Sequence, residues 1–161
     1  MSKKMQTELL KLLVIKAKGK NLSSMEKTFS TLYEIFEVNP EMAYENLEDD
    51  FRYATGQIIT ANTLDFLRTL DAKHINRIEE IINMCEKINF KLDYRISNDI
   101  TMMMGTFTDG IFEKRIGYEE LTRAAEVFRK LNLYPLVFHC ENAAYEIKND
   151  TNISENNRMA L

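Results

Sequence analysis

The sequence predicts an all-α protein of six to eight helices, stacked as antiparallel hairpins in a short α-solenoid-like arrangement, with no β-sheet. Apolar residues recur at three- and four-residue spacing along almost the whole chain, which is the period of an amphipathic helix. Only five Gly and two Pro occur among the 161 residues, and these are the residues that helix interiors tolerate least. No alternating apolar and polar run is bounded by hairpin-turn signals, so strands are not expected.

Residues 1–20 are predicted to be a basic amphipathic N-terminal helix, running from about Ser2 to Lys18. The segment holds six Lys and one Glu, and Gly19 is placed as a C-terminal stop. Basic, acid-poor amphipathic segments are typical of mitochondrial presequences, although those usually prefer Arg and Ser. The alternative is an ordinary amphipathic helix that docks on the core. We therefore expect an intracellular protein, in the mitochondrion or otherwise in the cytoplasm.

Residues 21–148 are predicted to be the helical-hairpin domain. Ser23 and Glu26 form a capping-box pattern that begins a helix ending near Asn39, and Pro40 suits the first position of the next helix. From residue 51 to residue 70 the helical pattern continues, and we expect it to split near Gly56, because an interior Gly weakens a helix.

The second half of this domain continues the pattern. Asp71 is expected to cap a helix that extends to Ile88, followed by a short connection over 89–92. Further helices are predicted around 96–107 and 118–131, separated by a loop over 106–117. Tyr134-Pro135 then opens a last helix, which ends near Ile147. Residues 149–161 are expected to be a polar C-terminal tail.

The chain contains an internal repeat at a spacing of 43 residues. The shift aligns Ile78, Ile81, Ile82, Cys85, Lys87, Ile88, Asn89 and Phe90 with Leu121, Ala124, Ala125, Phe128, Lys130, Leu131, Asn132 and Leu133. Self-similarity of this kind is a signature of stacked helical hairpins, which bury their apolar faces against their neighbours. The periodicity that all amphipathic helices share is the alternative explanation.

Two family resemblances follow from these segments. The units "IITANTLDFLRTL" with "NRIEEIINMCEKINFKLD", and "YRISNDITMMM" with "YEELTRAAEVFRKLNLYP", resemble pentatricopeptide repeats. This resemblance implies that Asn62, Asn98 and Asn142, at comparable places in successive first helices, face a partner or single-stranded RNA. Their separations are longer than that family's usual unit, and the second requires an insertion over 106–117.

The segment from Thr31 to Lys87, with "LYEIFEVNPEMAYENLEDDF" and "IITANTLDFLRTLDAKHINRIEEIINMCEK", is similar to cytochrome c oxidase subunit Va. That resemblance implies a mitochondrial accessory subunit built from helical hairpins. The sequence departs from that family by lacking Trp and by extending beyond its usual end.

No pattern in the sequence indicates a catalytic, cofactor or metal site. His139, Cys140 and Glu141 are adjacent, and adjacent helical residues point about 100° apart, so they cannot share one ion. The pairs Asp49-Asp50, Glu79-Glu80 and Glu119-Glu120 are interpreted as solvated helix faces. Cys85 and Cys140 are expected to be buried and reduced, with a disulfide as the alternative. The run Met102-Met103-Met104 is expected to fill the core rather than line an adaptable partner groove.

The charge distribution separates the two leading functions. Residues 1–20 carry a net +5, so the remaining 141 residues hold 15 Lys and Arg against 24 Asp and Glu. A net −9 disfavours nucleic acid as a partner. The sequence therefore predicts a non-enzymatic scaffold or accessory subunit that contacts other protein subunits, without a cofactor and without a transmembrane segment. The alternatives are a pentatricopeptide-like RNA-binding protein and an enzyme of unrecognised type.

Overall fold

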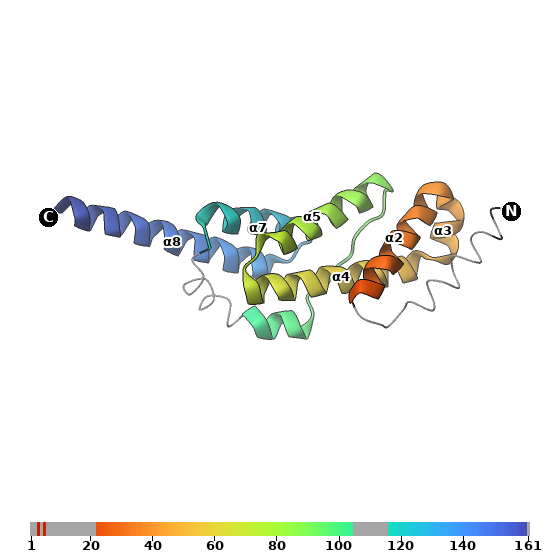
Figure 1. Cartoon of the computed structure of the whole chain (residues 1–161), viewed down its shortest axis with the longest axis horizontal. Coiled ribbons are helices and arrows are strands. Elements are labelled where there is room, and N and C mark those ends of the chain that lie inside the picture. The colour runs from red at the N-terminus through yellow and green to blue at the C-terminus, as the bar shows by residue number, and fades with distance from the viewer. Residues whose placement is uncertain (1–2, 4, 6–21, 105–115, 161) are drawn as a thin grey trace. The chain divides into compact units, whose positions relative to one another are not determined.

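The protein is all-α over the residues that the computed structural model describes, which are residues 3, 5, 22–104 and 116–160 (Figure 1). This part of the chain holds seven helices and no strand, as the helical periodicity predicts. Apart from residues 3 and 5, the expected N-terminal helix lies outside the described residues, and so does most of the expected loop over 106–117. No helix in the described part is both long and apolar enough to span a bilayer.

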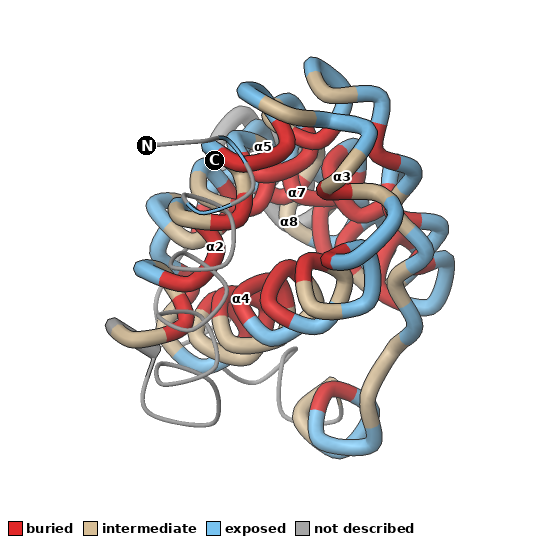
Figure 2. The backbone as a smooth tube through the Cα atoms, turned by 90° about the vertical axis from the view of Figure 1, so that its right-hand side faces the viewer, coloured by how far each residue is buried: buried red, intermediate tan, exposed pale blue. Residues whose placement is uncertain are grey.

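The helices are α2 (Leu22–Val38), α3 (Pro40–Asn46), α4 (Glu48–Thr69), α5 (Ala72–Lys87), a helix over residues 98–104, α7 (Tyr118–Lys130) and α8 (Tyr134–Ala160). Buried and exposed residues interchange along each helix with the helical period (Figure 2). The chain divides into two compact units. Unit 1 includes residues 22–61 and 80–93, and unit 2 includes residues 62–79 and the described residues from 94 onward.

Several helix ends lie where the sequence predicts them. Pro40 occupies the first turn of α3, although the Asn39 side chain makes no capping hydrogen bond. Asp71 caps α5, because its Oδ1 accepts a hydrogen bond from the Lys73 amide at 3.0 Å. The polar C-terminal segment 149–160 continues α8 as helical backbone rather than ending it near Ile147.

The expected split of the long helix near Gly56 is wrong, because α4 is continuous from Glu48 to Thr69. Phe51, Ala54, Ile58 and Ile59 around this glycine are fully buried. Burial of these side chains outweighs the roughly 1 kcal/mol by which an interior Gly weakens a helix. Tertiary packing therefore overrides the local preference at this position.

Unit 1 is built around a cluster of aromatic rings. Phe51 of α4 lies with its ring centroid 4.8 Å from that of Phe36 on α2 and 4.7 Å from that of Phe90. The Tyr44 hydroxyl on α3 donates a hydrogen bond to the Ile88 carbonyl at 3.0 Å. The Arg52 guanidinium lies 4.9 Å from the Phe90 ring centroid. These contacts hold the segment that follows α5 against α3 and α4.

Unit 2 contains the hairpin of α7 and α8, which pack against each other and are joined by three residues. Leu121, Phe128, Val137 and Cys140 are completely or almost completely buried. The ring of Phe66, on the last turns of α4, lies 6.1 Å from that of Phe128. The core of this unit therefore joins the α7–α8 hairpin to the end of α4.

The helix ends at Asn89 and Asn132 share one local geometry. Both residues have a positive φ, of 56° and 58°. The Phe90 amide donates to the Cys85 carbonyl at 2.8 Å, and the Leu133 amide donates to the Phe128 carbonyl at 3.0 Å. This is the Schellman pattern, in which a residue in the left-handed conformation ends the helix. Asparagine tolerates this conformation better than most residues. The donor and the acceptor residue of the first bond are related to those of the second by the 43-residue shift.

Candidate functional site

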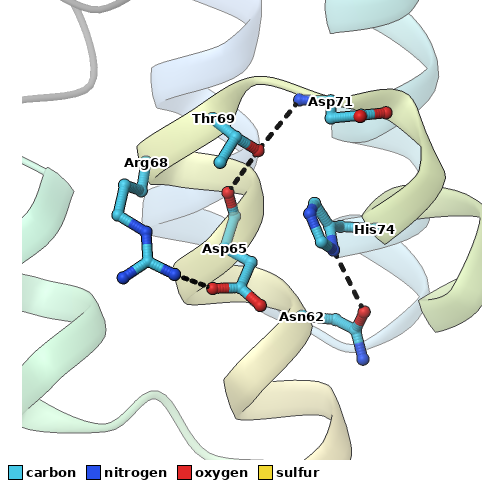
Figure 3. A network of polar contacts seen from close by, with 6 residues as sticks. All are labelled: Asn62, Asp65, Arg68, Thr69, Asp71 and His74. Carbon is cyan, nitrogen blue, oxygen red and sulfur yellow. Dashed lines mark hydrogen bonds and ion pairs between the residues drawn. The ribbon is translucent and has the colours of Figure 1, made fainter.

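A network of polar side chains surrounds the turn between α4 and α5, within unit 2 (Figure 3). The Asp71 amide donates to the Thr69 hydroxyl at 3.3 Å, and that hydroxyl donates to the Asp65 carbonyl at 2.7 Å. The Asp65 carboxylate forms an ion pair with Arg68. The bonds of Thr69 and Asp71 serve backbone groups at the end of one helix and the start of the next. This part of the network closes the turn.

The three asparagines singled out by their repeat positions have different environments. Asn62 is buried, with 7% of its surface exposed, and its Oδ1 lies 3.3 Å from Nδ1 of His74. Asn98, at the first turn of the helix over 98–104, and Asn142 on α8 are exposed. Only these two present an amide to the surface, while Asn62 joins α4 to α5.

The acidic pairs follow the helix surfaces as the sequence predicts. Asp49, Glu80 and both Glu119 and Glu120 are exposed. Glu79 is half-buried and accepts a hydrogen bond from the Arg123 guanidinium at 3.0 Å. Within the described part of the chain, no three His, Cys, Asp or Glu side chains are grouped so that they could hold a metal ion.

Both cysteines are free and buried. Burial raises the pKa of the Cys85 thiol to about 12, with a smaller contribution from the nearby Glu86 carboxylate. Burial and then Glu141 raise the pKa of Cys140 to about 12. His139 beside it is half-buried, whereas Glu141 is exposed and paired with Arg129. The thiolate is the nucleophile of cysteine chemistry, so these thiols are structural rather than reactive.

We expect both thiols to resist a disulfide reagent at about pH 8 in the folded protein and to react once the chain is unfolded. The raised pKa values also make the stability of the fold depend on pH. Because the folded pKa values of about 12 lie above the ordinary 9.0, the contribution of the protonated thiols to the free energy of unfolding is complete below about pH 9. That contribution is lost as the pH rises from 9 toward 12. Thiol titration with and without denaturant measures the first effect, and rapid reaction of a folded thiol would contradict it.

Two of the three consecutive methionines, Met102 and Met103, line an open groove. Met102 is 77% exposed, and Met103 and Met104 are half-buried. A groove of about 300 Å³ is lined by Leu64, Arg68, Asp99, Met102 and Met103. The prediction that these methionines are core residues is therefore wrong for Met102. Ile100 of the same helix is fully buried, and Met102 lies on the opposite side of the helix from it, whereas Met103 and Met104 lie closer to the buried side.

A second exposed surface lies on the α7–α8 hairpin, and we call it the aromatic face. It consists of Tyr118, Tyr134, Phe138 and Tyr145, whose side chains are 42%, 49%, 59% and 66% exposed. At about 100° per residue, the three members on α8 fall within roughly 40° of one another. The Tyr134 and Phe138 rings have centroids 6.5 Å apart.

The aromatic face is separate from the buried side of α8. Among residues 134–149 of this helix, the buried ones are Leu136, Val137, Cys140, Ala143 and Ala144. Tyr118, the member of the face on α7, contacts α8 through Lys148, whose Nζ lies 5.5 Å from the Tyr118 ring centroid. Tyr118 and Phe138 stand at apolar positions of the helical pattern, yet both are exposed. The signal that was available is that α8 carries apolar residues on two sides.

Charge is distributed unequally between the described parts of the two units. The residues of unit 1 from 22 onward hold four Lys and Arg against eleven Asp and Glu, and the described residues of unit 2 hold nine against eleven. No Lys or Arg occurs between Lys27 and Arg52, where seven Asp and Glu occur. Unit 1 from residue 22 onward is therefore strongly acidic, and the described part of unit 2 is close to neutral.

Comparisons with protein-family models, with curated protein sequences and with solved structures find no significant match.

Proposed function

We propose that this chain is a non-enzymatic helical scaffold or accessory subunit that contacts other protein subunits through the aromatic face of unit 2. The exposure of Tyr118, Tyr134, Phe138 and Tyr145 on one hairpin is the observation that carries the proposal. Large exposed apolar patches are uncommon on monomeric proteins and mark interaction surfaces. Tyr and Phe are also enriched at such interfaces, because they supply a large contact area at a low entropic cost.

The shared geometry after Asn89 and Asn132 supports a repeated hairpin unit within this proposal. A repeated hairpin is what the resemblances to pentatricopeptide repeats and to cytochrome c oxidase subunit Va imply. The assembly is then a mitochondrial respiratory complex if the basic segment 1–20 acts as a presequence, and a cytoplasmic assembly if it does not.

Isolation of the tagged full chain from its source cells tests the scaffold function. We expect companion chains in constant proportion with the wild type, and we expect their loss in a Phe138→Asp, Tyr145→Asp double variant. Both side chains are exposed, so the fold should tolerate the change. The matched control is Glu45→Ala together with Gln57→Ala, two exposed positions of unit 1. An identical set of companions in wild type and double variant would refute the aromatic face as the interface.

The alternative is a pentatricopeptide-like protein that binds single-stranded RNA. Exposed aromatic rings beside Lys148 are compatible with base stacking. The burial of Asn62 and the acidic surface of unit 1 weigh against it.

A titration with single-stranded RNA separates the two functions. At about 150 mM salt we expect no specific affinity, and at low salt only a weak attraction to the lysines of residues 1–20 that falls steeply as salt is added. Asn98→Ala and Asn142→Ala are expected to change nothing. Affinity that persists at this salt concentration and is lost with either substitution would make RNA binding the leading function.

A further inference from the structure

The exposed side of α8 carries a regular stripe of residues. Tyr134, Phe138, Glu141, Tyr145 and Lys148 follow one another at spacings of four, three, four and three. This is the seven-residue period of a seam between two helices. Glu141 and Lys148, the two charged members, are exposed.

The size of the aromatic face is close to what a pair of copies needs. Given the exposed fractions of its four members, the face presents about 450 Å² per copy, at roughly 200 Å² or slightly more for each whole aromatic side chain. Two such faces together approach the roughly 1,000 Å² at which a specific interface begins. An interface of this size is expected to be weak and reversible.

The two charges of the stripe, on Glu141 and Lys148, can attract those of a second copy whose α8 runs antiparallel to the first. In an antiparallel pair related by a two-fold axis, the same patch serves both copies, and one register places Glu141 opposite Lys148 of the second copy twice. That axis passes between residues 144 and 145, near the middle of α8. The two helices then overlap over residues 134–155, with Tyr145 beside its own counterpart, and with Phe138 and Tyr134 opposite residues 151 and 155 of the second copy. A parallel pair would set like charges against each other.

Glu141 and Lys148 already make contacts within their own chain, and these contacts do not compete strongly with the pairing between copies. Glu141 pairs with Arg129, and Lys148 lies over the Tyr118 ring. The Arg129–Glu141 pair is about half exposed on both sides, and such pairs contribute little free energy. A carboxylate also accepts more than one hydrogen bond.

From the spacing, the exposed area and the charges we infer that the aromatic face binds a second copy of this chain, with the two α8 helices antiparallel and Glu141 opposite Lys148. The inference rests on the proposed function, because it names the partner of the same surface.

Sedimentation of the purified full chain over a range of concentrations tests this pairing. The wild type should show a reversible equilibrium between monomer and dimer. Glu141→Lys and Lys148→Glu should each weaken the dimer roughly tenfold, since each replaces two attractions by two repulsions, and the double exchange should restore it. Glu45→Lys on α3 and Lys87→Glu on α5 are the matched controls, since both are exposed charges of unit 1. A chain that stays monomeric, or a double exchange that does not restore association, would overturn the pairing.

Crosslinking provides a second measurement that does not depend on affinity. A Tyr145→Cys variant should form a disulfide-linked dimer under a mild oxidant, because position 145 lies beside the axis, whereas Glu45→Cys should not. The native thiols are buried and do not interfere. Equal crosslinking of the two variants would contradict the predicted register.

The outcomes also distinguish this pairing from the scaffold function. If the purified wild-type chain is monomeric, and the Phe138→Asp, Tyr145→Asp variant loses its companion chains, the scaffold function stands and the pairing is refuted. If the double charge exchange restores the dimer, and the Phe138→Asp, Tyr145→Asp variant keeps the same companion chains as the wild type, the pairing stands and the scaffold function of the aromatic face is refuted. Stoichiometric RNA binding that blocks dimer formation would refute both.

Discussion

Replacing Phe51 by alanine is expected to lower the free energy of unfolding by about 3–5 kcal/mol, the usual cost of removing a fully buried phenylalanine side chain. Phe51 is completely buried in unit 1. Its ring centroid lies 5.4 Å from that of Phe29, and 4.8 Å and 4.7 Å from those of Phe36 and Phe90. The substitution would leave a cavity bordered by three other rings, which cannot all move inward to fill it.

Denaturant unfolding followed by circular dichroism measures this loss. Gln57→Ala, an exposed substitution six residues further along α4, serves as the control and should change the free energy by less than about 0.5 kcal/mol. If Phe51→Ala were as mild as this control, the aromatic cluster of unit 1 would not be the core of that unit.

The corresponding change in unit 2 is Phe128→Ala, for which we also expect a loss of about 3–5 kcal/mol. Phe128 is completely buried, and its ring lies 6.1 Å from that of Phe66. Its carbonyl accepts the hydrogen bond from the Leu133 amide that ends the helix. The substitution keeps this backbone bond and removes the side chain that joins α7 to the end of α4.

Thermal unfolding of Phe128→Ala beside Lys130→Ala provides the measurement and its control, because Lys130 is exposed in the last turn of the same helix. A midpoint for Phe128→Ala equal to that of Lys130→Ala would mean that α7 does not pack as described.

Helix positions could be predicted because their causes are local. Pro40 has no amide hydrogen to lose and fits the first turn of α3, and Asp71 supplies the capping oxygen of α5. Gly56 was misjudged, because its effect depends on the burial of Phe51 and Ile58 on either side of it. Local propensity does not report that burial.

The candidate site was harder to predict than the fold. Periodicity shows that Phe138 and Leu136 are on different sides of α8 but does not show which side is covered, since the covering helix is a tertiary feature. In the structure Leu136 is buried and Phe138 is exposed. Asn62 occupies a repeat position similar to that of Asn98, yet its amide is buried beside His74. Alignment by position does not determine which of these residues reaches the surface.

The size of the native particle shows whether this chain acts through its aromatic face. Sedimentation of the tagged full chain in a lysate of its source cells should show it in a particle much heavier than the 18.9 kDa of the chain. The Phe138→Asp, Tyr145→Asp variant should sediment as a small species, because the aromatic face is then charged. If the wild type and the variant sediment at the same rate, whether as free chains or in one large particle, the chain does not act through its aromatic face.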